Sequence, residues 1–134
     1  AGNRAEVVYE EDIYVGYRYY NTFGVEPAYA FGYGLSYTEF DYNDLKLSAS
    51  EFDDEITVTV TVRNTGETPG REVVQLYLSA PGDALDKPES ELRAFAKTGL
   101  LHPGSSETVT FPLSRRDLAS FDTDRAAWVA EAGT

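Results

Sequence analysis

A run of alternating β-branched residues in the middle of the chain is the feature that most constrains its fold. From Ile56 to Val62, apolar side chains at the even positions alternate with three threonines. This period of two is typical of a strand with one buried face, and β-branched side chains fit the pleated surface of a sheet. Turn-forming residues follow at 64–66 and 69–70. The run therefore predicts an antiparallel strand that ends at a tight turn.

Three further segments in the second half of the chain carry strand signals. Residues 72–78 are apolar on both faces in part, which predicts a central strand. Residues 91–96 and 108–113 alternate between apolar and polar positions. Short strands with turns about every ten residues indicate a sandwich of two antiparallel sheets, so the expected fold class is an all-β, immunoglobulin-like sandwich.

The end of the chain predicts a short turn followed by a last strand. Ser114 and Asp117 have the spacing of a capping box, with aspartate in place of the usual glutamate or glutamine. We therefore expect one helical turn over Leu118 and Phe121. A strand is then predicted at 125–131.

The first 42 residues differ in composition from the rest, because they hold nine of the ten tyrosines. Glycine and proline interrupt any long regular element there, so we expect one strand at 13–20 and an extended arm for the remainder. Tyrosine combines large apolar area with a polar tip, which suits a surface that packs on another domain. The same rings could instead stack on sugar rings, and both interpretations stay open. The candidate residues for either role are Tyr14, Tyr17, Tyr19, Tyr20, Tyr33 and Trp128.

Composition and charge exclude several functional classes. The chain has no cysteine, which excludes a disulfide scaffold, a thiolate zinc site and a cysteine nucleophile. His102 is the one histidine, too few for a histidine-based triad or zinc site. The net charge of −12 disfavours nucleic acid as a partner. No apolar run approaches the ~20 residues of a membrane span, so no membrane association is expected. Acidic clusters at 10–12 and 53–55 are interpreted as solvated surface. No metal or cofactor is predicted, and the compartment stays open.

Six motifs follow one another along the chain, at residues 9–20, 31–40, 62–66, 70–78, 91–95 and 101–105. In this order they resemble the C-terminal portion of glycoside hydrolase family 3 enzymes, the β-glucosidase and β-xylosidase group. The two aromatic motifs ahead of the predicted sandwich are the most specific part of the resemblance. The chain starts at Ala1 and contains no methionine, and we interpret it as a piece of a longer protein.

The resemblance implies a division into two parts. Residues 1–36 would be the tail of the family's preceding α/β sandwich domain with a linker arm, and residues 37–134 a fibronectin type III-like β-sandwich. The family's catalytic aspartate stands in a serine-aspartate-tryptophan-type motif, and here Trp128 follows Ala127 instead. No catalytic residue is therefore expected. The implied function is a non-catalytic accessory domain that docks on and stabilises the catalytic domains, with a carbohydrate- or surface-binding module as the alternative.

The resemblance also implies partners. The family continues with an aromatic-rich final strand after the segment that corresponds to residues 131–134. Without that strand, one sheet would have an unpaired edge with free N–H and C=O groups. The expected partners are thus the catalytic domains of the parent glycosidase, and for the isolated chain a homodimer or a strand-swapped species. The sequence does not predict the sugar or the linkage on which the parent acts.

Overall fold

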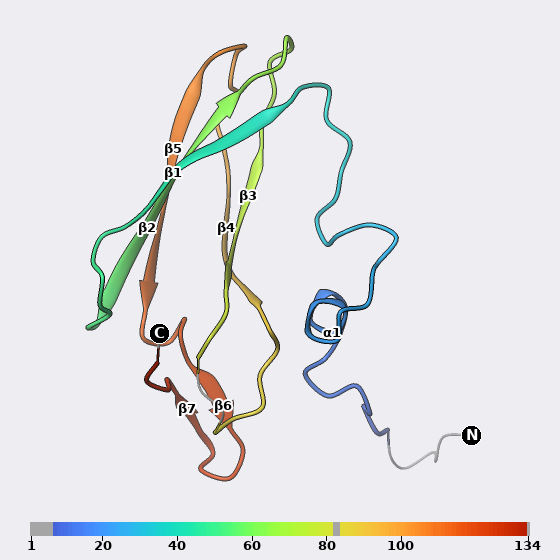
Figure 1. Ribbon diagram of the computed structural model, residues 1–134, viewed down its shortest axis with the longest axis vertical. Helices are drawn as coiled ribbons and strands as arrows, with labels where there is room; N and C mark the ends of the chain where they lie inside the picture. Colours follow the sequence, from blue (N-terminus) through green and yellow to red (C-terminus); the bar gives the residue numbers. More distant parts are fainter. Residues whose placement is uncertain (1–6, 82–83, 134) are drawn as a thin grey trace.

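The computed structural model, which describes residues 7–81 and 84–133, has two facing antiparallel sheets beside an N-terminal segment (Figure 1). One sheet has three strands in the order β1-β2-β5: β1 (Phe40–Leu47), β2 (Glu55–Asn64) and β5 (Ser106–Ser114). The other sheet has two strands: β3 (Val73–Leu78) and β4 (Glu91–Lys97). The predicted all-β, fibronectin type III-like sandwich is confirmed.

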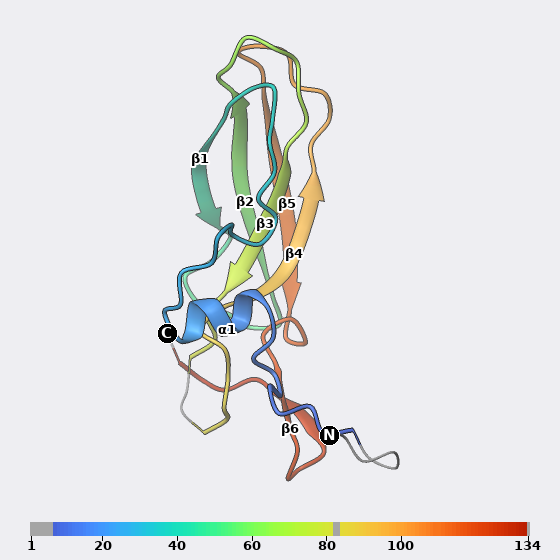
Figure 2. The same ribbon diagram turned by 90° about the vertical axis from the view of Figure 1, so that its right-hand side faces the viewer.

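Two smaller elements complete the described part of the chain. A hairpin of two short strands extends beyond the end of the sandwich: β6 (Ser120–Asp122) and β7 (Ala127–Val129). A single helix, α1 (Tyr17–Thr22), lies beside the β3–β4 sheet (Figure 2). No helix within residues 7–81 and 84–133 is long and apolar enough to cross a membrane.

The core lies between the two sheets and is built as the alternation predicts. In β2, Val58, Val60 and Val62 are buried, while the threonines between them are only partly covered. Val58 lies opposite Phe111 in the register with β5, and both side chains belong to the core. Val74 of β3 joins them from the other sheet. Burial of a side chain of this size contributes about 1.5–3 kcal/mol relative to exposure, so the β2–β5 pair is the centre of the fold.

The core is open along the edge between β1 and β3. A groove of about 360 Å³ lies there, lined by Tyr42 and Leu45 of β1 and by the core residues Val58, Val74 and Phe111. In the described part of the chain β3 pairs with β4 alone, so its other edge is unpaired. Among the described residues the outer edges of β1, β4 and β5 are unpaired as well, and the edge of β3 is the one that borders the groove.

A fully buried asparagine at the end of β2 connects the N-terminal segment to the sandwich. The Asn64 Nδ2 group donates to the carbonyls of Thr68 at 2.8 Å and Leu101 at 2.9 Å. Its Oδ1 accepts from the Thr38 hydroxyl at 2.7 Å and the Gly66 N–H at 3.0 Å. Thr38 lies just before β1, so this one side chain sets where the N-terminal segment enters the sheet.

The strand predicted at 13–20 is wrong, because residues 17–22 form α1 instead. Gly16 has φ 56° and ψ −130°, a conformation outside the extended region that breaks a continuous strand. Helical bonds then follow, such as that from the Phe23 N–H to the Tyr19 carbonyl at 3.0 Å. The tyrosine-rich pattern therefore has the period of a helix over this stretch and not that of a strand.

The prediction that residues 72–78 form a central strand is also wrong, since β3 has a neighbour on one edge only. Its outward-facing residues, Gln75 and Tyr77, are partly covered by the N-terminal segment. Because the N-terminal segment covers the outer face of β3, this strand can carry apolar residues on both faces. A second neighbouring strand is not needed to explain them.

The end of the chain follows the prediction in part. Asp117 accepts hydrogen bonds from both the backbone N–H and the hydroxyl of Ser114, as in a capping box. These two bonds hold the pKa of the Asp117 carboxyl below its usual range. The turn ends before Phe121, which lies in β6, and the predicted last strand is limited to β7.

Candidate functional site

The N-terminal segment is attached to the β3–β4 sheet by polar contacts on one side of α1. The Tyr17 hydroxyl accepts from the Leu92 N–H at 2.8 Å. Arg18 forms an ion pair with Glu91 at 3.1 Å. One turn further along α1, Asn21 Nδ2 donates to the Ser90 hydroxyl at 3.2 Å. These contacts to the start of β4 fix the orientation of the helix.

Aromatic packing and one glycine bring the next stretch of the segment onto the outer face of β3. The Tyr17 ring lies 5.5 Å from the Tyr77 ring and 5.2 Å from the Phe31 ring, centroid to centroid. Gly32, with φ +81°, lies so close to Gln75 that a Cβ there would be 2.2 Å from Gln75 Nε2. Because only glycine has neither a Cβ nor a steric penalty at positive φ, residue 32 permits this approach.

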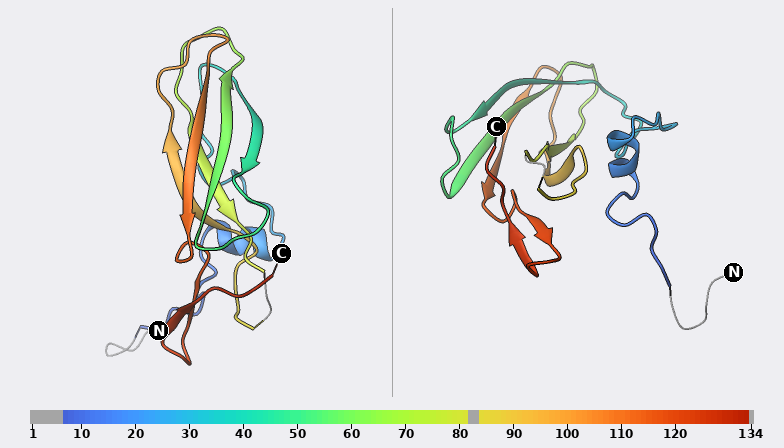
Figure 3. Two further views of the ribbon diagram at one scale, coloured as in Figure 1. Left: turned by 90° about the vertical axis from the view of Figure 1, so that its left-hand side faces the viewer. Right: turned by 60° about the horizontal axis from the view of Figure 1, so that its bottom comes forward.

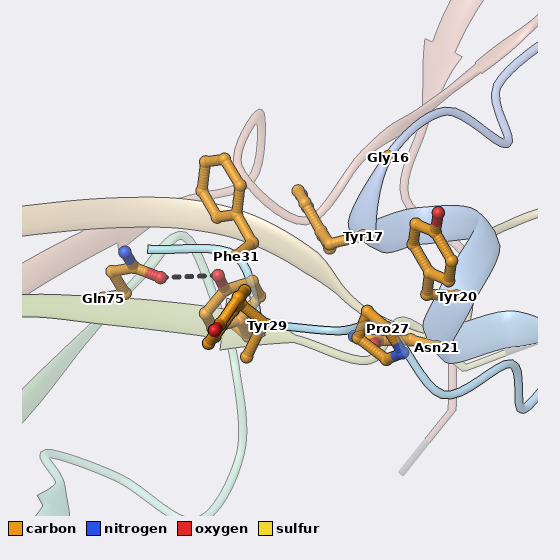
Figure 4. A pocket seen from close by; sticks show the side chains of 10 residues that line it. Gly16, Tyr17, Tyr20, Asn21, Pro27, Tyr29, Phe31 and Gln75 are labelled. Atoms are coloured by element: carbon orange, nitrogen blue, oxygen red, sulfur yellow. Dashed lines mark hydrogen bonds between the residues drawn. The ribbon is translucent and has the colours of Figure 1, made fainter. Parts of the chain in front are cut away.

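A pocket of about 460 Å³ lies between α1, residues 27–31 and the outer face of β3 (Figure 4). Its aromatic residues are Tyr17, Tyr20, Tyr29, Phe31 and Tyr77, and its side-chain amides are Asn21 and Gln75. The Tyr77 hydroxyl donates to Gln75 Oε1 at 2.5 Å, which orients the amide. None of the described residues that line the pocket is charged. We name this feature the aromatic pocket.

The other side of α1 carries a second group of rings, which we name the outer aromatic cluster: Tyr14, Tyr19 and Phe23. The Phe23 ring lies 5.1 Å from Tyr14 and 5.0 Å from Tyr19, centroid to centroid. The Tyr14 hydroxyl donates to the Asp86 carboxylate, and this bond raises the pKa of Tyr14. Tyr19 and Phe23 are exposed. The cluster is thus anchored to the sandwich at Tyr14 and open to solvent at the other two rings.

The structure divides the six candidate residues into three groups. Tyr17 and Tyr20 line the aromatic pocket, and Tyr33 stacks on the pocket residue Tyr29 at 4.9 Å. Tyr14 and Tyr19 belong to the outer aromatic cluster. Trp128 packs on Phe121 within the β6–β7 hairpin, and the chain around residues 85–92 lies between that hairpin and α1 (Figure 3). The six candidate residues therefore do not form one surface, because Trp128 lies apart from the tyrosines.

Sequence reasoning missed five of the aromatic and amide residues of the aromatic pocket: Asn21, Tyr29, Phe31, Gln75 and Tyr77. A helical period over 17–21 would have placed Tyr17, Tyr20 and Asn21 on one face. No sequence signal connects Gln75 to this segment, because the contact is made by tertiary packing. Among residues 7–81 and 84–133, no three histidine, aspartate or glutamate side chains are grouped so that they could hold a metal ion.

Large exposed apolar side chains are concentrated in the N-terminal segment. Of the 21 such residues in the described ranges, 13 lie at or before Tyr37. Single exposed apolar residues are normal on a protein surface, whereas a contiguous set marks an interaction site. The segment therefore has the properties of a contact surface.

Comparison with known proteins finds a matching family model for the second half of the chain and relatives that match nearly all of it. Residues 72–134 match the family model of the fibronectin type III-like domain. A solved structure of β-glucosidase 3B from Thermotoga neapolitana in complex with α-D-glucose is 57% identical, with a TM-score of 0.86, over 95% of this chain and 17% of that chain. A β-glucosidase of glycoside hydrolase family 3 from Bifidobacterium adolescentis is 36% identical, with a TM-score of 0.85, over 92% of this chain and 18% of that one.

A curated relative agrees with these structures. The thermostable β-glucosidase B of Acetivibrio thermocellus is 42% identical over 134 residues, which is 98% of this chain and 18% of the relative. The chain thus spans less than a fifth of the length of each of these proteins, and the similarity includes the aromatic segment as well as the sandwich. The chain corresponds to the fibronectin type III-like portion of glycoside hydrolase family 3 β-glucosidases, together with the segment that precedes it.

Proposed function

We propose that this chain is a non-catalytic accessory part of a family 3 glycosidase that docks on the catalytic domains and stabilises them. The observation that carries the proposal is the outer aromatic cluster, in which the Tyr19 and Phe23 rings are exposed although α1 is held firmly on the sandwich. An interdomain contact would bury these rings, since aromatic area dominates such interfaces. The parent protein would hydrolyse β-glycosidic bonds, as its relatives' names indicate.

The exposed fractions of the side chains give the size of the stabilisation that docking is expected to provide. Tyr19 is 44% exposed, Phe23 56% and the neighbouring Val15 53%. Full burial of one such side chain contributes about 1.5–3 kcal/mol, so the half that remains exposed contributes about 1 kcal/mol each. Docking through these three side chains would therefore stabilise the assembled protein by roughly 3 kcal/mol, before the cost of association.

We further propose that the boundary between the two parts lies near residue 36. In this division residues 1–36 continue the preceding α/β sandwich domain and residues 37–134 form the fibronectin type III-like sandwich. It is supported by the position of Thr38, whose hydroxyl bond to Asn64 is the first contact of the chain with the buried end of β2. Residues 1–6 lie outside the described part.

The proposal is tested by adding the chain to the rest of its parent enzyme. That remainder is expressed without residues 1–134, and its melting temperature and turnover of p-nitrophenyl glucoside are measured with and without the purified chain. We expect both to rise with added chain until they saturate. A remainder that is equally active and stable without the chain would remove the stabilising role, and glucosidase turnover by the chain alone would contradict the non-catalytic one.

A pair of double variants makes the test specific to the surface. Tyr19→Ala/Phe23→Ala truncates the outer aromatic cluster, whereas Phe121→Ala/Trp128→Ala truncates an equally exposed pair on the β6–β7 hairpin. We expect the first double variant to abolish the effect of the added chain and the second to leave it. Equal loss in both would mean that docking does not depend on α1.

A further inference from the structure

The aromatic pocket adjoins the surface that the docking proposal uses, because the Tyr20 ring of the pocket lies 5.8 Å from the Tyr19 ring of the outer aromatic cluster, centroid to centroid. Its rings lie on the side of α1 that faces β3, whereas the outer aromatic cluster lies on the other side. A pocket of about 460 Å³ lies within the range of small-molecule sites, which are concave, mostly apolar and equipped with a few placed polar groups. From this chemistry we infer that the aromatic pocket binds a neutral carbohydrate ring.

The apolar part of the pocket fits the carbon face of a sugar. Tyr29 and Phe31 remain 70% and 57% exposed although their neighbours pack on the sandwich. Figure 4 shows these rings and Tyr20 around one opening. Aromatic faces carry partial negative charge, and the C–H groups on one face of a pyranose ring carry partial positive charge, so the two surfaces attract each other.

The polar part of the pocket supplies one donor and one acceptor for hydroxyl groups. Gln75 Oε1 is occupied by the Tyr77 hydroxyl, whereas Gln75 Nε2 donates to no acceptor within the described residues. Asn21 Nδ2 donates to Ser90, which leaves Asn21 Oδ1 as an acceptor. Each amide is thus oriented by one hydrogen bond and keeps one polar atom for a ligand, which is the donor Nε2 in Gln75 and the acceptor Oδ1 in Asn21. Hydroxyl groups, which donate and accept at once, match this pair.

The charge distribution favours a neutral ligand over an ionic one. No described residue that lines the pocket carries a charge, so an ion placed there would lose hydration without gaining a partner. The net charge of −12 on the whole chain further opposes an anion such as a sugar acid or sugar phosphate. The ligand class is therefore an uncharged mono- or oligosaccharide.

Titration of the 134-residue chain by NMR tests this inference without the catalytic domains, so its result does not depend on docking. The probes are methyl β-D-glucopyranoside and cellobiose, with glucuronate as the charged comparison and benzyl alcohol as an aryl ligand without a sugar ring. We expect saturable shifts of Gln75, Asn21 and residues 29–31 with the two neutral sugars and weaker binding of glucuronate. Absence of shifts at tens of millimolar sugar, or saturation by benzyl alcohol alone, would overturn the inference.

Variants separate binding from folding. Tyr29 is highly exposed, so Tyr29→Ala should leave the fold intact and weaken cellobiose binding about tenfold, which corresponds to about 1.4 kcal/mol. Tyr29→Phe keeps the ring and should keep the affinity. Gln75→Leu removes the free donor and should weaken binding, while Trp128→Ala, on the separate hairpin, should not. Unchanged affinity in both Tyr29→Ala and Gln75→Leu would place the sugar elsewhere and refute the assignment.

Discussion

Truncation of Asn64 gives the sharpest test of how the sandwich holds its N-terminal segment. The Asn64→Ala variant removes four hydrogen bonds from a side chain with no exposed surface. Two of the four groups that lose a hydrogen bond have another partner. Thr68 is exposed, so its carbonyl can bind water, and the Leu101 carbonyl still accepts from the Gly70 N–H at 3.0 Å. The loss of folding stability in Asn64→Ala therefore comes mainly from the other two partners.

Those two partners, the Thr38 hydroxyl and the Gly66 N–H, lose their bonds in a partly buried setting. The Gly66 N–H retains only a long bond of 3.4 Å to the Glu39 carbonyl. An unsatisfied buried group costs about 1–3 kcal/mol, and the vacated volume adds a smaller cost. We therefore expect the free energy of unfolding to fall by about 2–4 kcal/mol.

Urea unfolding followed by circular dichroism measures this loss. With an m-value of about 2 kcal/mol/M, the midpoint should fall by about 1–2 M at an unchanged slope. Asn43→Ala replaces an exposed asparagine of β1 and should change stability by less than about 0.5 kcal/mol. A midpoint for Asn64→Ala equal to that of the Asn43→Ala control would refute the view that this side chain secures the segment.

The pH dependence of Asn64→Asp distinguishes lost hydrogen bonds from lost volume. One oxygen of the new carboxylate would replace Nδ2 and face the carbonyl oxygens of Thr68 and Leu101, so the folded-state pKa should be raised. A raised pKa stabilises the folded state below the unfolded value, near 3.9, and that stability is lost as the pH rises through the folded pKa. Relative to the unmodified chain, Asn64→Asp should thus be more stable at pH 4 than at pH 7. A difference independent of pH would contradict the assigned geometry.

Three other predictions follow from the structure. Gly32→Ala should destabilise the chain more than Gly24→Ala, because both positions have positive φ but only residue 32 would place a Cβ against Gln75; equal melting temperatures would contradict this. Glu131 pairs with Lys87, and the hydrogen bond from Lys87 lowers the pKa of Glu131. The stability that Glu131→Gln removes should therefore be present at pH 7, decrease below the usual glutamate pKa near 4.3 and be lost as the pH falls through the lower folded-state pKa. Urea titrations at pH 7 and pH 3 that show the same difference would exclude this role. The free edge of β3 beside the open groove should make the isolated chain a dimer or strand-swapped species in sedimentation, and monomer alone at high micromolar concentration would end that prediction.

The parts of the fold that were predictable from the sequence are those where one face is buried and the other is solvated. β2 and β5 have this property, and their alternation of apolar and polar residues reveals it. β1 lacks such a signal, because it is an exposed edge strand whose register shifts between Asn43 and Lys46, next to Asp44 with φ 54°. An irregular edge strand has few buried positions, so its sequence carries little periodicity.

The sequence predicts which segment of the chain contributes to the candidate site, but it does not predict how the side chains of the site are arranged. Tyrosine enrichment indicates the correct segment, but the grouping of rings depends on α1, which turns Tyr17 and Tyr20 toward β3 and Tyr19 away from it. The Gln75 amide of the aromatic pocket comes from β3, more than forty residues further along the chain, so local patterns contain no information about it.

Attachment at both ends makes the aromatic segment a fixed part of the molecule. Tyr17 and Arg18 bind the start of β4 at one end, and Thr38 binds Asn64 at the other. The conformational entropy of ordering the rings is therefore lost when the chain folds and not when a partner or a sugar binds. A flexible arm would lose that entropy on binding, at about 0.5–1.5 kcal/mol for each side chain immobilised. The bonds that hold α1 and Thr38 thus lower the cost of contact for both the outer aromatic cluster and the aromatic pocket, which connects the stability of the sandwich to each proposed function.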